Sequence, residues 1–529
     1  MKIVVAEPMS PAAIALLKKQ EDWNVIVSNP KEYEPQLADC DALLVRSAVK
    51  VKADTLEKAP KLRVVGRAGV GVDNVDLAAC TAAGVLVMNT PGGNAISVAE
   101  HTLALMLSLA RSIPEASAST RSGKWEKKKF LGNELRGKTL GVVGLGNIGQ
   151  EVVRRARGFE MRILASDPYV SPVTAEDLGV ELAPLDRLIA ESDYISLHVA
   201  LTPETRGMIN ADSIAKMKDG VRIVNCARGE LIEQEALRAA LASGKVAGAG
   251  LDVFDPEPLP PDHPLLSADK LIATPHIAGS TEEAQEIVGI RIVEQLVEYL
   301  RNGVAINAVN MPAVSPEQYK TLAPYLTLAE QLGKFAAFVA TGNPVAVRVT
   351  YSGRIAEMNT NLLRNAALAG VLSRGLSSRV NLVNAMGLAG QRNLVVAESR
   401  EPRSGAMDTV QISLETGAGL TTVSGGVILD KPRLLAVDGI AVEITLGGRL
   451  IYMRNVDVPG VIGHVGTVLG HNQINIANFS LGRQEKAEPG QPLFAVALVE
   501  VDSEVPSQVL EELRAHPAVR LATVVEPGV

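Results

Sequence analysis

The sequence is poor in cysteine and in long apolar runs, and each shortage excludes a class of protein. Its 529 residues include only three cysteines, Cys40, Cys80 and Cys226, which are widely spaced and form no CxxC pair. This argues against a disulfide framework and against a metal site, and it fits a reducing cytoplasm. No apolar run approaches the roughly 18 residues needed to span a membrane. The N-terminus lacks the basic, apolar and small-residue order of a signal peptide, so we expect a cytoplasmic protein.

Aromatic residues and positive charge are also scarce. Aromatics make up 3% of the chain, which leaves few platforms on which bases could stack. The formal net charge is -7, and a general nucleic-acid binder needs a basic face. The hydrophobic fraction of 47% and the charged fraction of 21% are ordinary for a soluble globular protein. A chain of this length exceeds one hydrophobic core, so about three or four domains are expected.

The first 300 residues alternate short apolar runs with amphipathic segments. Runs such as "KIVVAE", "LRVVGRA", "TLGVVGLG" and "VRIVNCAR" are continuously apolar, which is typical of parallel strands covered on both faces. Two sets of such runs predict two doubly wound α/β domains. The spacing predicts long helices over 97–113 and 281–303, the second with a C-cap signal at Asn302-Gly303.

The composition and the pattern of expected helices and strands change after Gly303. A proline-containing linker precedes a region, about 316–445, whose first half is rich in Ala and Leu and whose second half is β-branched. The last 80 or so residues follow a β-α-β-β-α order, which suggests a ferredoxin-like sandwich. We therefore expect an α+β domain and a small ferredoxin-like domain after the two α/β units.

A glycine-rich turn carries the first functional signal. Gly144, Gly146 and Gly149 have G-x-G-x-x-G spacing between an apolar strand and a helix, and Asp167 follows the next strand. The glycines permit a tight turn and close approach to a pyrophosphate at the helix N-terminus. Asp167 can accept hydrogen bonds from the ribose hydroxyls and would repel a 2′-phosphate, so NAD is favoured over NADP. The alternative is a strand–helix turn without a ligand.

Three further strand ends carry a set of side chains suited to one reaction. Arg228 in "NCARGE" can grip a carboxylate with two parallel hydrogen bonds. His276 in "TPHIAGST" can exchange a proton with a hydroxyl as hydride leaves the same carbon, and Glu257 in "DVFDPEP" can orient the imidazole. Ligands of doubly wound sheets bind at these strand ends. Taken singly, each residue could be a surface ion pair or a loop cap, and "STEE" from Ser280 has capping-box spacing.

These motifs together resemble the D-isomer-specific 2-hydroxyacid dehydrogenases. The quoted blocks and "VVGRAGVGVDNVD", "MNTPGGNAISVAEH" and "KWEKKKFLGNELRGKTLGVVGLG" agree with that family in order along essentially the whole chain. The resemblance is closest to long-form members that act on 3-phospho-D-glycerate and carry an intervening domain and a C-terminal ACT domain. It implies a Rossmann-like NAD domain, residues 94–284, inserted in a flavodoxin-like substrate domain, residues 1–93 and 285–310. The intervening domain would cover 311–446 and the ACT domain 449–529.

The resemblance also implies site residues. The cofactor set comprises Gly144, Gly146, Asn147, Ile148, Gly149, Asp167, Cys226, Ala227, Arg228, Asp252, His276, Ile277, Ala278 and Gly279. The substrate set comprises Arg46, Ser47, Arg67, Gly69, Val70, Asn94 and Lys127. The two arginines of the substrate set suit a phosphate-bearing acid, and the Gly69–Gly71 loop can offer N–H groups to a carboxylate. Relatives often have Thr at position 70, and "WEKKKF" around Lys127 is equally well read as a solvated charge run.

The implied ACT domain suggests an effector site. Asp457, Asn475 and Asn455 are candidates for binding L-serine between two ACT domains, although Asp and Asn are also common turn residues. The family resemblance further implies a homotetramer.

The predicted activity is NAD-dependent oxidation of 3-phospho-D-glycerate to 3-phosphooxypyruvate, the first step of the phosphorylated route to L-serine. A side activity on 2-oxoglutarate stays open. One alternative is another D-2-hydroxyacid dehydrogenase, acting on glyoxylate, lactate or 2-hydroxyglutarate. A second is an NAD-sensing corepressor or scaffold on the same fold.

Overall fold

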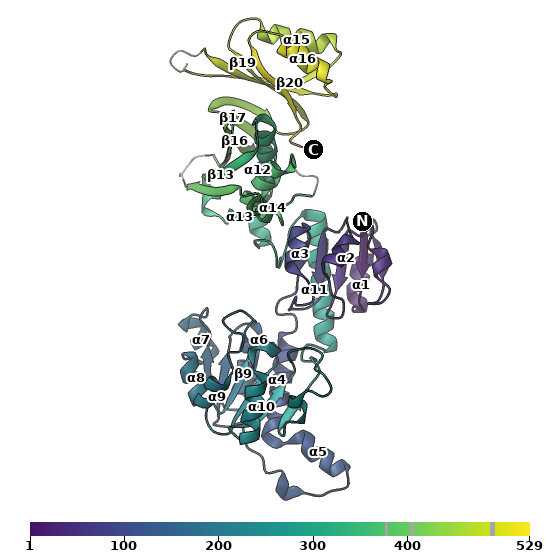
Figure 1. Cartoon of the computed structure of the whole chain (residues 1–529), viewed down its shortest axis with the longest axis vertical. Coiled ribbons are helices and arrows are strands. Elements are labelled where there is room, and N and C mark those ends of the chain that lie inside the picture. Colours follow the sequence, from purple (N-terminus) through teal and green to yellow (C-terminus); the bar gives the residue numbers. More distant parts are fainter. Residues whose placement is uncertain (376–378, 403–406, 487–491, 529) are drawn as a thin grey trace.

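The computed structural model describes residues 1–375, 379–402, 407–486 and 492–528, and it contains four sheets arranged along an elongated molecule (Figure 1). The first two sheets are wholly parallel and the last is wholly antiparallel. The predicted mixed α/β fold class, with Rossmann-like parallel sheets followed by an antiparallel-rich region and an ACT domain, is therefore confirmed.

The N-terminal sheet has the order β2-β1-β3-β4-β5, which is the flavodoxin-like order. Its strands are β1 (Lys2–Val5), β2 (Asn24–Val27), β3 (Ala42–Val45), β4 (Val64–Arg67) and β5 (Leu86–Met88). Its helices are α1 (Pro11–Lys18), α2 (Ala53–Glu57), α3 (Leu77–Ala82) and, from much later in the chain, α11 (Glu282–Asn302). A short 3-10 helix, η1 (Glu34–Gln36), lies between β2 and β3. Separate hydrophobic clusters cover the two faces, which explains the continuous apolar runs.

The second sheet has the order β12-β11-β10-β9-β6-β7-β8. Its strands are β6 (Thr139–Val143), β7 (Arg162–Ser166), β8 (Glu181–Leu182), β9 (Tyr194–Leu197), β10 (Val221–Asn225), β11 (Val246–Leu251) and β12 (Leu271–Ala273). The helices are α4 (Ala95–Arg111), α5 (Ile113–Arg121), α6 (Asn147–Arg157), α7 (Pro172–Leu178), α8 (Leu185–Glu191), α9 (Ala211–Lys216) and α10 (Gln234–Ser243). Three 3-10 helices accompany them, η2 (Lys127–Lys129), η3 (Gly229–Leu231) and η4 (Pro264–Ser267). Chain order reverses between β6 and β9, which is where doubly wound sheets bind ligands.

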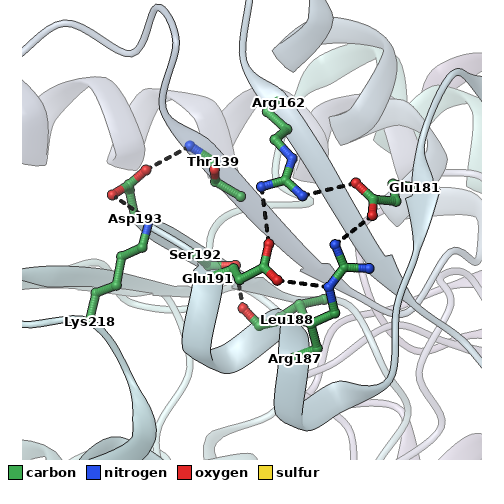
Figure 2. A network of polar contacts seen from close by, with 9 residues as sticks. All are labelled: Thr139, Arg162, Glu181, Arg187, Leu188, Glu191, Ser192, Asp193 and Lys218. Atoms are coloured by element: carbon green, nitrogen blue, oxygen red, sulfur yellow. Dashed lines mark hydrogen bonds and ion pairs between the residues drawn. The ribbon is translucent and has the colours of Figure 1, made fainter.

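A network of ion pairs lies where the strands of this sheet begin, at the end away from their carboxyl ends (Figure 2). Arg162 at the start of β7 contacts Glu181 of β8 at 2.9 Å and Glu191 at the end of α8 at 3.0 Å. Arg187 of α8 contacts the same two carboxylates at 2.6 and 2.7 Å. Hydrogen bonding to Arg162 and Arg187 lowers the pKa of Glu181. The closed ring holds the two-residue edge strand β8, and it lies away from the strand ends that carry the predicted site.

The third sheet is mixed, with the order β14-β13-β15-β16-β17-β18. Its strands are β13 (Pro344–Ser352), β14 (Val395–Glu401), β15 (Thr409–Thr416), β16 (Gly419–Ile428), β17 (Lys431–Val437) and β18 (Ile440–Thr445). Its helices are α12 (Pro316–Val339), α13 (Asn361–Ser373) and α14 (Ala385–Gln391), with η5 (Arg354–Glu357) between them. Helices α12 and α13 cross closely because Gly333 and Gly370 carry no Cβ. A Cβ on Gly333 would lie 2.2 Å from the Ala367 carbonyl oxygen, and one on Gly370 would lie 2.0 Å from that of Glu330.

The C-terminal sheet has the ferredoxin-like order β20-β21-β19-β22. It consists of β19 (Arg449–Val456), β20 (Ile476–Arg483), β21 (Phe494–Val501) and β22 (Val519–Val525), with helices α15 (Val461–His471) and α16 (Ser507–Arg514). One face packs on these helices and the other joins the core of the preceding domain, where the Phe335 and Tyr452 rings meet edge to face at 5.7 Å.

The helix ends show where local sequence signals held. Ser10 caps α1 with Pro11 at its first position, and Gly303 ends α11 with φ of +76°. The cap of α11 is Thr281, whose hydroxyl accepts from the Ala284 N–H at 3.1 Å, so assigning the cap to Ser280 was wrong by one residue.

Candidate active site

The predicted cofactor residues lie at the carboxyl ends of β6, β7, β10, β11 and β12. Gly144 has φ of +94°, and a Cβ there would lie 2.7 Å from the carbonyl oxygen of His198. A Cβ on Gly149 would lie 2.0 Å from the carbonyl oxygen of Gly144, whereas one on Gly146 would meet open space. The outer two glycines are thus required by the turn itself, and the middle one leaves room for a ligand.

The first turn of α6 offers free donors beside that space. Among the described residues, the N–H groups of Asn147 and Ile148 donate to no protein acceptor, and Gly146 at the N-cap supplies no side chain. Such a helix end attracts a pyrophosphate through its N–H groups and its dipole. The turn therefore fits a dinucleotide.

Asp167 follows β7 and is already tied to the glycine-rich turn. Its Oδ2 accepts from the Leu145 N–H at 2.8 Å, and its Oδ1 accepts from the Tyr169 N–H at 2.8 Å. Each carboxylate oxygen keeps further lone pairs, so Asp167 can fix the turn and accept from ribose hydroxyls together.

His276 and Glu257 form a direct pair at the ends of β12 and β11. The His276 Nδ1 lies 2.7 Å from Glu257 Oε2, and Glu257 Oε1 accepts from the Phe254 N–H at 2.9 Å. The hydrogen bond to Glu257 outweighs burial and raises the pKa of His276. Burial opposes ionisation of Glu257, but its hydrogen bonds to His276 and Phe254 prevail and lower the pKa. With Nδ1 engaged, Nε2 is the nitrogen left for a substrate.

Asp252 lies beneath the His276 loop rather than on its surface. Its side chain is fully buried and accepts from the Thr274 hydroxyl at 2.6 Å and from the N–H groups of Ile277 and Ala278 at 2.9 and 2.8 Å. Burial disfavours its charge, yet these bonds and nearby His101 keep its pKa below the usual value. Its position is that of a support for the turn carrying His276.

Arg228 follows β10 and contacts the loop that follows β4 of the N-terminal sheet. Its Nη2 donates to Asp73 Oδ2 at 2.8 Å and its Nη1 to the Ala227 carbonyl oxygen at 2.6 Å. Asn225, 1% exposed, braces this segment by bonding the Arg228 carbonyl oxygen and the Ala227 N–H.

The predicted substrate residues of the N-terminal sheet lie at or after the carboxyl ends of β3, β4 and β5. Buried Glu7 accepts from the N–H groups of Arg46, Ala48 and Val49, which shapes the loop that exposes Ser47. A Cβ on Gly69 would lie within 1.6 Å of Arg67 Nη1, so glycine makes room for that guanidinium.

Donors and acceptors that lack a protein partner line this side of the cleft. Within the described ranges, the Val70 and Gly71 N–H groups have no acceptor, and the buried Arg67 Nε and Asn94 Oδ1 have no partner. Asn94 lies beside Gly279, where an added Cβ would approach its Nδ2 to 2.7 Å.

Two predicted residues stand apart from the others. Cys226 is buried, and burial raises the pKa of its thiol to about 12, so it is no nucleophile at neutral pH. Lys127 lies on η2, beyond the α5 arm that Figure 1 shows projecting from the end of the NAD domain away from α11. No contact in the described chain joins Lys127 to the cleft, so the structure does not bring it to the other substrate residues.

Sequence reasoning missed several residues at the site. His198 follows β9 beside Gly144, bonds Ser196 at 2.8 Å, and has a pKa lowered by burial to about 4. His101 of α4 bonds the Thr274 hydroxyl at 3.0 Å. The run "YISLHV" could have revealed His198 as a strand end, whereas the partners of His101 and Asp73 are more than 150 residues away in the chain.

The three predicted effector residues already have partners within the C-terminal domain. Asp457 Oδ2 accepts from Arg483 Nε at 2.8 Å, and Asn475 donates to Asp502 at 2.5 Å. Asn455 is 2% exposed and donates to the Val456 carbonyl oxygen, while its own buried Oδ1 has no partner among the described residues. The structure does not gather these three side chains into one open pocket.

No set of three or more His, Cys, Asp or Glu side chains in the described ranges is grouped to hold a metal ion. Among the helices of those ranges, none is long and apolar enough to cross a membrane.

Comparison with known families and proteins agrees along the chain. The NAD-binding domain model of D-isomer specific 2-hydroxyacid dehydrogenases matches residues 103–278, the D-3-phosphoglycerate dehydrogenase intervening domain matches 321–438, and the ACT domain matches 449–518. D-3-phosphoglycerate dehydrogenase of Methanocaldococcus jannaschii is 44% identical over 99% of both chains. That of Archaeoglobus fulgidus is 43% identical over 99% of this chain and 100% of its own.

Solved structures match more than half of the chain. The TT0316 protein from Thermus thermophilus is 36% identical, with a TM-score of 0.54, over 58% of this chain and 100% of its own. D-Lactate dehydrogenase from Aquifex aeolicus, complexed with NAD and lactic acid, is 31% identical, with a TM-score of 0.52, over 59% of this chain and 100% of its own.

Proposed function

Since the chain belongs to the D-3-phosphoglycerate dehydrogenase family and is an NAD-dependent oxidoreductase, we propose that it oxidises 3-phospho-D-glycerate to 3-phosphooxypyruvate. This reaction is the first step of the phosphorylated route to L-serine. The observation that carries the proposal is the His276–Glu257 pair, 2.7 Å apart, at the strand ends that also hold Arg228 and the glycine-rich turn.

The proposed roles follow from what each side chain can do. NAD, when bound at the glycine-rich turn, would supply the acceptor for the hydride that leaves C2 of the substrate. Nε2 of His276 takes the proton from the C2 hydroxyl, and Glu257 stabilises the imidazolium that forms. Arg228 holds the C1 carboxylate together with the N–H groups of Val70 and Gly71. Arg46 and Arg67, with Ser47, take the phosphate, and Asn94 remains a proposed substrate contact.

The proposed cofactor contacts combine the turn and the loops around it. The α6 N-terminus and Gly144–Gly149 hold the pyrophosphate, and Asp167 accepts from the ribose. Cys226, Ala227 and Arg228 flank the nicotinamide side, as does the loop from His276 to Gly279. Because Asp252 is buried, its contribution is to hold that loop.

The test is NADH consumption with 3-phosphooxypyruvate, pyruvate, glyoxylate and 2-oxoglutarate. We expect the highest kcat/KM for 3-phosphooxypyruvate, with 2-oxoglutarate as a slower substrate, since two arginines can also take a second carboxylate. His276→Ala should lower kcat by about 10²–10⁴ while NADH binding stays near that of the unmodified chain. Preference for pyruvate or glyoxylate would indicate a different 2-hydroxyacid dehydrogenase. Absence of turnover with all four would indicate a scaffold.

The proposed domain division follows the four sheets. Residues 1–93 and 285–310 would form the substrate domain, 94–284 the NAD domain, 311–446 the intervening domain and 449–529 the ACT domain. Support comes from α11, which lies at 282–302 in the chain yet packs on the N-terminal sheet. Limited proteolysis with mass spectrometry should cut first near residues 303–315.

For regulation, we propose that L-serine binds between the ACT domains of a cytoplasmic homotetramer. The exposed apolar side chains Val458 and Ile462 beside the α15 N-terminus suit a contact with a second copy. Asp457 would exchange Arg483 for the ligand ammonium, with Asn475 and Asn455 nearby. The free, buried cysteines suit a reducing compartment.

Calorimetric titration with L-serine tests the effector site. We expect binding and inhibition by the intact protein, and loss of both in Asp457→Ala. Binding that survives Asp457→Ala unchanged would locate the site elsewhere, and no heat at millimolar serine would leave the ACT domain as an assembly element.

A further inference from the structure

Three arginines from two domains gather at the cleft. Arg46 follows β3, Arg67 ends β4, and Arg228 comes from beyond β10. Burial lowers the pKa of Arg67, and the charges of Arg228 and Arg46 lower it further, whereas Asp73 and Glu7 act in the opposite direction. A substrate with two anionic ends meets a set of cations that would all be drawn to its more highly charged end.

Of these three arginines, Asp73 forms an ion pair with Arg228. Its Oδ2 lies 2.8 Å from Arg228 Nη2, although the two residues belong to different domains and lie 155 positions apart. The Ala227 carbonyl oxygen holds the other terminal nitrogen at 2.6 Å. Both terminal nitrogens of the Arg228 guanidinium are therefore engaged, one by Asp73 and one by the Ala227 carbonyl oxygen.

The loop backbone is shaped around this pair. A Cβ on Gly71 would lie 2.2 Å from Arg228 Nη2 and 2.8 Å from Asp73 Oδ2, so a side chain at position 71 would have to displace the ends of both partners. The Asp73 side chain is 68% exposed, and an ion pair so exposed contributes little to stability. Its geometry is better explained by the position it imposes on Arg228.

We infer that Asp73 is a positioning residue that keeps Arg228 at the carboxylate end of the substrate and thereby leaves Arg46 and Arg67 for the phosphate. This inference rests on the proposed function. Without Asp73, Arg228 would join the other two arginines as part of a general anion site. Substrate would then bind in unproductive orientations, and simple dianions would bind more tightly.

The test is Asp73→Asn, which keeps size and removes charge. We expect kcat/KM for 3-phospho-D-glycerate to fall by about 10- to 100-fold, the range set by misplacing a substrate. The dissociation constant for sulfate, measured by calorimetry, should fall by about fivefold, because one partly screened negative charge is gone. The dissociation constant for NADH should not change. A merely structural defect would weaken sulfate binding as well as turnover.

Asp76→Asn is the matched control. Its carboxylate caps α3 by accepting from the Ala79 N–H at 2.9 Å and does not contact Arg228, and Asn caps helices equally well. It makes the same charge change three residues away, so neither kcat/KM nor sulfate affinity should move. Asp73→Glu, which restores the charge, should recover part of the lost turnover and the weak sulfate binding.

Two results would overturn the inference: identical behaviour of Asp73→Asn and Asp76→Asn, or weaker sulfate binding in Asp73→Asn. Absence of turnover by the unmodified protein would instead refute the proposed function. In that case, equal sulfate affinities of Asp73→Asn and Asp76→Asn would still refute the proposed restraint of Arg228.

Discussion

His276 has a backbone φ of +53°, a left-handed conformation that is uncommon for residues other than glycine. Its N–H donates to the Asp252 carbonyl oxygen at 2.8 Å, and the next two N–H groups donate to the Asp252 carboxylate. The surrounding bonds thus hold the loop in a conformation that local preference would not select. Such strain is concentrated at functional sites.

The charge state of His276 leads to a pH prediction. The hydrogen bond to Glu257 raises the pKa of His276, and a base works only when unprotonated. Oxidation of 3-phospho-D-glycerate should therefore rise with pH, with a midpoint in kcat/KM above the ordinary imidazole value of about 6.5.

Glu257→Gln should shift that midpoint down toward the ordinary value and lower kcat, because the imidazolium loses its carboxylate partner. The measurement is the pH profile of kcat/KM for both proteins. If the midpoint did not change in Glu257→Gln, the rise of kcat/KM with pH would have to reflect the titration of another group.

Asp167 leads to a prediction about cofactor choice. Asp167→Asn keeps an oxygen that can accept from the Leu145 N–H, so the glycine-rich turn should persist, but the charge that repels a 2′-phosphate is lost. The preference for NAD over NADP, measured as the ratio of their kcat/KM values, should decrease, mainly because kcat/KM for NAD falls. A ratio equal to that of the unmodified protein would mean that the ribose is recognised elsewhere.

At the scale of elements, helix α4 holds the His276 loop from one side. Ser97 contacts the Thr281 hydroxyl at 2.7 Å and His101 contacts that of Thr274 at 3.0 Å, from positions that share one helix face. Thr274 also donates to Asp252 at 2.6 Å. The helix, the threonine and the carboxylate form one chain of hydrogen bonds that ends at the turn carrying His276.

Thr274→Val should break this chain with little change in shape. His101 and Asp252 would each lose a partner in a poorly solvated place, which costs about 1–3 kcal/mol in the free energy of unfolding. We also expect a several-fold lower kcat, because the turn carrying His276 loses part of its support. Denaturant unfolding and steady-state kinetics measure the two effects. Ser97→Ala is the comparison, since it breaks the contact between α4 and Thr281 but leaves the hydrogen bonds of Asp252 in place. If both variants lowered stability and kcat equally, the proposed role of Thr274 would be contradicted.

Elements with a local cause were predictable and those with a distant cause were not. The Gly144–Gly149 turn, the Gly303 stop and the Ser10 cap depend on neighbouring residues, so the sequence pattern predicted them. The edge strands β2 and β8 were missed because one is largely exposed and the other has two residues. The Arg228–Asp73 pair joins two domains, and no pattern within either segment indicates it.

The effector residues show the same limit. The family resemblance implies Asp457 and Asn475, but no pattern in the sequence indicates that Arg483 and Asp502 bind them. Pairing across a sheet depends on strand register, which a single sequence specifies only weakly.

At the scale of the whole molecule, the intervening and ACT domains share a hydrophobic core. Leu450, Tyr452 and Leu498 of the C-terminal sheet belong to the same buried cluster as Phe335 of α12. Asn381 also links this unit to the N-terminal part of the chain by donating to the Gly84 carbonyl oxygen at 2.7 Å, and the buried Val383 belongs to a hydrophobic cluster of the N-terminal sheet. The C-terminal sheet and α12 therefore belong to one packed unit.

A shared core predicts shared unfolding. Leu513 lies in the ACT core and Leu363 in the intervening core, and both are fully buried. Leu513→Ala and Leu363→Ala should each cost about 2–5 kcal/mol of stability. In calorimetry both should lower the temperature of the same transition, whereas the transition that NADH raises should stay in place. Two separate transitions, each moved by only its own variant, would show that the domains fold independently and that the Phe335–Tyr452 contact joins them too weakly to couple them.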